Sequence, residues 1–126
     1  MSNHSNHKKP YRFPGFTGPY YTQVPDVVFD ELLPILSGTE IKVLMYIIRR
    51  TFGFKKQKDN ISLSQLVDGI ITKDGQVLDG GTGLGKSSVA RSLTSLEKKN
   101  IITRTRRSNA KKGHKATTYT LNIKDS

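Results

Sequence analysis

TGLGKSSVARSLTSLEKK, residues 82–99, is the stretch of sequence that decides the predicted fold. Val89, Leu93 and Leu96 recur at the spacing of one helical face, and such a face packs against a core. Gly85 is the expected N-cap of this helix. The predicted outward side carries Lys86, Ser87, Ser88, Arg91, Ser92 and Ser95. One face of the helix is therefore expected to pack, while the other is small and basic.

Two capping boxes upstream of this stretch predict two further helices. Ser37-Gly38-Thr39-Glu40 opens a strongly apolar helix that is expected to end near Gly53, and Ser62-Leu63-Ser64-Gln65 opens a shorter one. Before them, Asp26 can cap a short extra helix that Pro34 prevents from continuing. The predicted core thus has three helices, preceded by a short one.

β-structure is predicted after the third helix and within one insertion. Residues 101–107 and 117–123 have the composition and alternation of two strands, joined by the polar loop SNAKKGHKA. In the second strand Thr117, Tyr119, Leu121 and Ile123 are expected to face inward, with Thr118, Thr120 and Asn122 outward. Asp74-Gly75 between β-prone flanks predicts a hairpin-like insertion at about 71–81.

The order of these elements predicts a mainly α fold with a small β-hairpin. Three helices followed by a hairpin with a cationic tip form a winged helix-turn-helix, here a three-helix core with a C-terminal two-stranded wing at about 101–123 and the short N-terminal helix. Residues 1–19 are predicted to be a flexible N-terminal arm, and residues 20–126 the single domain.

Composition narrows the class of protein. The chain has 126 residues and a net charge of +11, from 21 Lys and Arg against 10 Asp and Glu. Residues 86–115 hold ten basic residues and one acidic one, a net of +9, so the excess is concentrated where a polyanion such as nucleic acid can bind. The longest apolar run, 43–48, is too short for a bilayer, no secretory signal is recognisable and no cysteine is present. A cytoplasmic protein without a membrane partner is expected.

One motif suggests a different function. Gly80 to Ser87, GGTGLGKS, matches the P-loop pattern GxxxxGK[ST], in which backbone amides and a lysine hold nucleotide phosphates. A P-loop also requires a buried parallel strand before it and further βα units after it. Only Val77-Leu78 precedes the motif as an apolar run, and 39 residues follow it. We therefore interpret these residues as the turn before the third helix, with a P-loop nucleotide-binding protein as the alternative.

The same stretch resembles a known family. TGLGKSSVARSLTSLEKKNII is similar to the region around the reading helix of winged-helix DNA-binding proteins, and residues 20–70 resemble the N-terminal domain of phage replication protein O and related phage or plasmid initiators. The resemblance implies origin recognition, with a replicative helicase or its loader as a further partner. The chain departs from the family pattern at Gly85 and Asn100, and in its insertion.

The predicted function is sequence-specific binding of double-stranded DNA, without an enzymatic activity and without a cofactor or metal. The third helix is expected to enter the major groove, and the wing to contact the flanking backbone. The predicted DNA-binding residues are Thr82, Lys86, Ser87, Ser88, Arg91, Ser92, Arg104, Arg106, Arg107, Lys111, Lys112, His114 and Lys115. The alternatives are a transcriptional repressor of the same fold and a winged helix used only for protein contacts. A homodimer is a further partner hypothesis.

Overall fold

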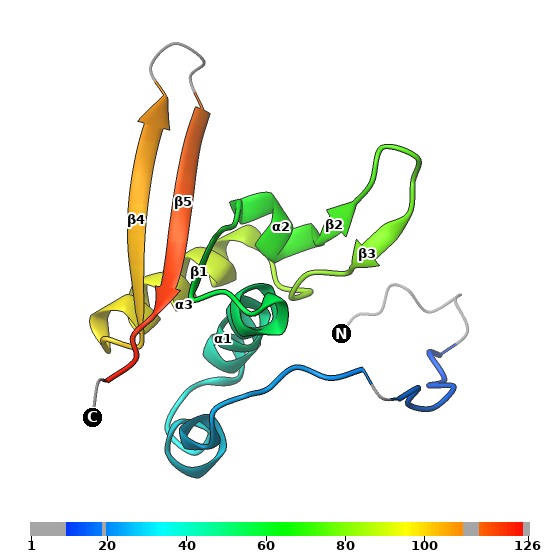
Figure 1. Cartoon of the computed structure of the whole chain (residues 1–126), viewed down its shortest axis with the longest axis horizontal. Coiled ribbons are helices and arrows are strands. Elements are labelled where there is room, and N and C mark those ends of the chain that lie inside the picture. The colour runs from blue at the N-terminus through cyan, green and yellow to red at the C-terminus, as the bar shows by residue number, and fades with distance from the viewer. Residues whose placement is uncertain (1–9, 19, 110–113, 125–126) are drawn as a thin grey trace.

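The structure is a computed structural model and describes residues 10–18, 20–109 and 114–124. Within these ranges it holds three α-helices, a three-stranded antiparallel sheet and a separate two-stranded hairpin (Figure 1). Helices followed by a β-hairpin are what the sequence predicts. Residues 10–18 and 20–25 of the N-terminal segment form no helix or strand, and the other residues of the predicted arm lie outside the described ranges.

The first helix, α1, spans Gly38–Thr51 and begins with the predicted capping box. Ser37 Oγ accepts a hydrogen bond from the Glu40 amide at 3.1 Å, and Glu40 Oε1 accepts one from the Ser37 amide at 2.8 Å. The helix ends at Thr51, close to the predicted end near Gly53. A 3₁₀ turn, η3 (Phe52–Phe54), follows the helix directly, and the left-handed residue is Lys55, with φ of 58°. The tighter turn carries the chain past Gly53 before it reverses.

The predicted short N-terminal helix is present in a different form. It contains the π-helical turn η2 (Val28–Leu32), in which the Leu33 amide donates to the Val28 carbonyl at 2.8 Å. Asp26 provides no side-chain cap. Of the four apolar side chains at 28, 29, 32 and 33, only Val28 is fully buried, and Phe29 and Leu33 are each 51% exposed.

Two further helices complete the core beside α1. Helix α2 (Leu63–Asp68) begins at the second capping box, and α3 (Lys86–Lys98) has Gly85 as its N-cap, both as predicted. The expected inward residues of α3, Val89, Leu93 and Leu96, are each at most 2% exposed. They pack in one apolar cluster with α1 residues such as Leu44 and Ile47.

The predicted two-stranded wing is part of a three-stranded sheet. Strand β1 (Lys58–Asn60) pairs with β5 (His114–Leu121), which pairs with β4 (Ile102–Asn109). We call β4, β5 and the loop between them the basic hairpin. Because β1 covers one edge of β5, Thr118 is buried and donates to Asn60 Oδ1 at 2.5 Å, contrary to its predicted outward position. Ile123 lies beyond β5 and is exposed, which corrects its predicted inward position.

The predicted insertion is a small hairpin, which we call the short hairpin. It consists of β2 (Ile70–Ile71) and β3 (Val77–Asp79), with Gly75 in the turn at φ of 89°. In Figure 1 it and the basic hairpin project on either side of α2. Asp79 fixes its base to α1, because both carboxylate oxygens accept from the Tyr46 hydroxyl at 3.1 Å and Arg50 lies 3.7 Å away. Burial and the bond to Asp79 raise the pKa of Tyr46 to about 12.

Candidate nucleic-acid interface

The outward face of α3 is basic, small and exposed. Its exposed residues are Lys86, Ser87, Ala90, Arg91, Thr94 and Lys98, opposite the buried apolar face. A shallow groove runs along this face, lined by Ala90, Arg91, Thr94, Ser95 and Lys98. Small side chains beside two long cationic ones allow another molecule to approach the helix backbone closely.

Three residues of this face were missed at the sequence level. Ala90, Thr94 and Lys98 share the exposed surface with Ser87 and Arg91. The helical period places them on this face, because positions 87, 91, 94 and 98 follow one another at intervals of four, three and four residues. Ala90 and Thr94 carry no charge, and Lys98 lies in the last turn of the helix.

The N-terminus of α3 adds to the positive character of this face. Gly85 has no side chain with which to cap the helix, so the first backbone amides have no side-chain acceptor. Lys86 and Ser87, both exposed, are the first helical residues. Unpaired amides and the helix dipole favour an anion at this end.

Two predicted contact residues, Thr82 and Ser92, are buried, and for Ser92 this corrects its expected outward position. Ser92 is 4% exposed, because it lies on the side of α3 that packs against α1. Thr82 is 8% exposed; its hydroxyl donates to the Leu66 carbonyl at 2.6 Å and accepts from the Leu84 amide at 3.2 Å. Thr82 therefore ties the turn before α3 to α2. Neither side chain has the exposed surface that a direct contact needs.

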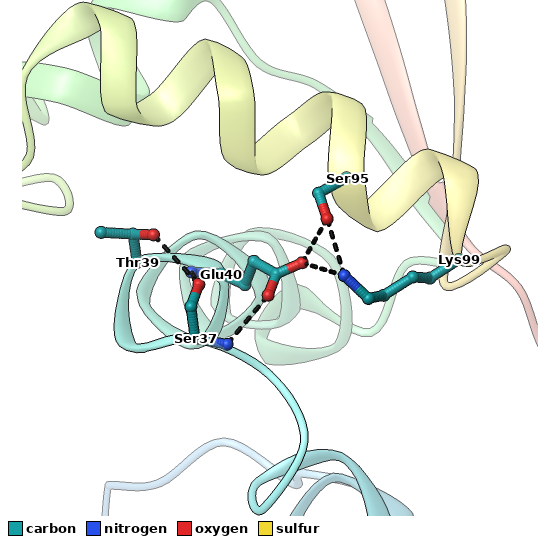
Figure 2. A network of polar contacts seen from close by, with 5 residues as sticks. All are labelled: Ser37, Thr39, Glu40, Ser95 and Lys99. Atoms are coloured by element: carbon teal, nitrogen blue, oxygen red, sulfur yellow. Dashed lines mark hydrogen bonds and ion pairs between the residues drawn. The ribbon is translucent and has the colours of Figure 1, made fainter.

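Ser95, also expected outward, takes part in a network that joins α1 to α3 (Figure 2). Glu40 Oε2 accepts hydrogen bonds from Ser95 Oγ at 2.6 Å and from Lys99 Nζ at 2.8 Å, while Oε1 caps α1. Burial alone would raise the pKa of Glu40, but the hydrogen bonds from Lys99, Ser95 and Ser37 outweigh it and lower the pKa from 4.5 to about 2. This carboxylate fixes the C-terminal half of α3 against the start of α1.

Arg104, predicted to contact DNA, is instead held against α3. Its Nε and Nη2 donate to Glu97 Oε1 at 3.1 and 2.8 Å, and Nη2 lies 3.4 Å from Thr94 Oγ1. Its side chain is only 10% exposed. The hydrogen bond from Arg104 lowers the pKa of Glu97. The pair therefore joins β4 to α3 and neutralises the one acidic residue of segment 86–115.

We expect Arg104→Met to lower the free energy of unfolding by about 1–2 kcal/mol, because two hydrogen bonds to a carboxylate are lost from a mostly buried side chain. The pKa of Glu97 should rise in the variant. Urea unfolding and NMR titration of the Glu97 carboxyl measure the two effects. Arg106→Met is the matched control, since Arg106 is exposed on the same strand. Equal losses in the two variants would contradict the assignment.

The other predicted wing residues lie along the basic hairpin. Arg106 is exposed on β4. Arg107 is paired with Ala116 in the strand register, Ser108 with Lys115 and Asn109 with His114. Lys111 and Lys112 lie outside the described residues. The register thus brings Arg107, His114 and Lys115 to neighbouring positions near the end of the hairpin.

Comparison with known proteins identifies the family of the chain. The family model for bacteriophage replication protein O matches residues 19–118, which include all three helices and most of the three-stranded sheet. The chain belongs to this phage replication family, as its resemblance predicted. No match was found among curated proteins or among solved structures. Within the described ranges no helix has the length and apolar character needed to span a membrane.

Proposed function

We propose that this chain is a winged helix-turn-helix protein that binds double-stranded DNA sequence-specifically in the initiation of phage replication. The observation that carries the proposal is the outward face of α3, where exposed Lys86, Arg91 and Lys98 alternate with small side chains. A helix of this kind fits the major groove, and its N-terminal residues are the ones that reach base edges. The matched family supports the role in replication.

The roles of individual residues follow from their placement. Arg91 is exposed in the middle of this face and is the proposed guanine reader, since its planar fork can bind two acceptors at once. Lys86, Ser87 and the first amides of α3 would contact a phosphate, and Ser88 lies partly exposed beside them. The cationic positions of the basic hairpin, with exposed Arg106 at its stem, would contact the flanking backbone.

The nucleotide-binding alternative lacks structural support at the P-loop pattern. Strand β3, which precedes Gly80–Ser87, has three residues, pairs antiparallel with β2 and leaves Val77 and Leu78 exposed. A P-loop follows a buried parallel strand. We therefore propose a binding protein rather than an enzyme. The replicative helicase or its loader remains a proposed partner, and a transcriptional role of the same DNA-binding surface is distinguished by the genetic location of its preferred site.

The salt dependence of duplex binding tests the proposal. If α3 and the basic hairpin neutralise about six phosphates, the logarithm of affinity should fall with the logarithm of salt concentration at a slope of about −5. Replacing Lys111, Lys112 and Lys115 with alanine should weaken binding to all sequences alike and flatten the slope by about one unit per lost contact. Fluorescence anisotropy over a salt series measures both effects.

Lys73→Ala is the matched control, because Lys73 is an exposed lysine in the turn of the short hairpin. Its slope is expected to equal that of the wild type. If the slope stays unchanged in the triple variant, the tip of the basic hairpin does not contact the DNA. Saturable, magnesium-dependent binding of ATP that Lys86→Ala abolishes would overturn the proposed function as a whole.

A further inference from the structure

A second cluster of basic residues lies at the end of α1, apart in sequence from residues 86–115. Residues 49–58 include no acidic residue and five basic ones, Arg49, Arg50, Lys55, Lys56 and Lys58. Asp79 compensates Arg50 at 3.7 Å, and Asp59 compensates Lys56 at 3.3 Å. The other three are exposed, and none of them forms an ion pair with another described residue. The cluster therefore keeps three positive charges for an anionic partner.

An exposed aromatic ring lies in the middle of this cluster. Phe54, the last residue of η3, is 46% exposed. Arg49 Cζ and Arg50 Cζ lie 4.8 and 4.6 Å from the centroid of its ring. These cation–π contacts hold two planar guanidinium groups against a planar ring. We call Arg49, Arg50 and Phe54 the Phe54 platform.

The Phe54 platform lies away from the outward face of α3. Helix α1 packs against the buried side of α3, and the platform belongs to the last turn of α1 and to η3. The N-terminal segment passes beside it, since Thr22 Oγ1 and Arg49 Nη1 both lie within 3.0 Å of the position that a Cβ on Gly53 would take. Tyr21, the neighbour of Thr22, is 83% exposed. A second exposed aromatic side chain therefore belongs to the segment that passes the platform.

This combination of groups matches the chemistry of a single strand of nucleic acid. The bases of a duplex cover one another's faces, so only a single strand can place a base against an aromatic ring or a guanidinium plane. Lysines beside such a platform attract the phosphates between the bases. A duplex would use the charges of the cluster but not its planar surface.

We propose that the Phe54 platform binds single-stranded DNA, with a base stacked on the platform and phosphates at Lys55 and Lys58. Stacking uses the faces of the bases and not their edges, so the site accepts many sequences. The proposal rests on the proposed function only for the choice of DNA over RNA. Strand binding here and duplex binding by α3 use different residues, and each is tested without the other.

Fluorescence anisotropy with two labelled strands tests the proposal. One is an oligomer of about ten thymidines, and the other is an abasic oligomer of the same length. Both carry the same phosphates, so attraction to the basic hairpin is the same for both. The wild type should bind the thymidine strand at least about fivefold more tightly than the abasic strand.

Phe54→Leu should abolish that preference and leave binding to the abasic strand unchanged, because it removes the ring and no charge. Phe29→Leu is the matched control, since Phe29 is 51% exposed on η2, and it should retain the preference. Arg91→Ala should also retain it, even if α3 proves to bind no duplex. Circular dichroism checks that the variants retain the fold.

Phe54→Trp provides a direct readout of stacking. The chain contains no tryptophan, so the fluorescence of this variant reports on position 54 alone. The thymidine strand should quench it, whereas the abasic strand and a duplex should not, because neither offers a base face. Equal wild-type affinity for the thymidine and abasic strands would overturn the proposal. So would wild-type binding of the thymidine strand by Phe54→Leu, or equal quenching by the duplex, which would make the cluster a general phosphate contact.

Discussion

Replacing Glu40 with alanine is expected to lower the free energy of unfolding by about 3 kcal/mol, the largest effect on stability that we predict for a polar residue of this protein. The change removes half of the capping box of α1. It also leaves Lys99 and Ser95 without the carboxylate that joins them to the start of α1. Urea unfolding measures the loss, and thermal unfolding should follow it.

The contribution of Glu40 should depend on pH in a defined window. The pKa of Glu40 in the folded protein is about 2, whereas its ordinary value, which applies in the unfolded chain, is 4.5. The unfolded chain therefore takes up the proton first as the pH falls. The stabilisation is therefore complete above about pH 4.5 and disappears as the pH falls towards 2. Glu31→Ala is the control, since Glu31 is exposed. A difference between wild type and Glu40→Ala that is the same at pH 3 and pH 7 would contradict the assignment.

Replacing Arg91 with alanine is expected to weaken binding to the preferred DNA site by about 1–3 kcal/mol, and binding to random DNA much less. The reason is that a bidentate pair with guanine exists only on the preferred site, whereas attraction to phosphates exists on both. The ratio of the two affinities should therefore fall by up to about 5- to 150-fold. Selection of bound duplexes from a random pool provides the site, and anisotropy titrations provide the two affinities.

Lys98→Ala provides the matched control on the same face of α3. Lys98 is exposed in the last turn of the helix, where a point charge can approach a phosphate. Its loss should weaken binding to both kinds of DNA equally and leave their ratio unchanged. Equal losses for Arg91→Ala would make Arg91 a phosphate contact, and the base reader would have to be sought elsewhere on the face.

Features that depend on neighbouring residues were predictable from the sequence. The capping boxes at Ser37 and Ser62 and the N-cap at Gly85 are set by hydrogen bonds that span a few residues. The buried face of α3 follows from helical periodicity, and the short hairpin from Asp74-Gly75. Each of these signals lies within one element, so no knowledge of the tertiary structure is needed to recognise it.

Features that depend on distant residues were missed or misplaced. Strand β1 is short and polar, Lys58-Asp59-Asn60, and it is a strand only because it pairs with residues 118–120. Ser92 resembles a surface residue by type, but a small side chain also permits the close approach of α1 and α3. From the sequence, Arg104 was expected to be a cation available to DNA. The alternation of side chains along β4 does not reveal that Arg104 lies against Glu97 of α3. In each case the partner that decides the outcome lies on another element.

The position of β5 has a consequence for synthesis on the ribosome. Strand β1 pairs with β5, which is translated more than fifty residues later. Strand β4 also pairs with β5. The three helices can pack against one another soon after residue 98 emerges, whereas Ile102, Tyr119 and Leu121, which complete the core, are made later. The sheet has to wait for the last strand, since pairing across such a separation closes a long loop. A nascent chain thus presents α3 before the hairpin beside it exists, and the two parts of the basic surface mature one after the other.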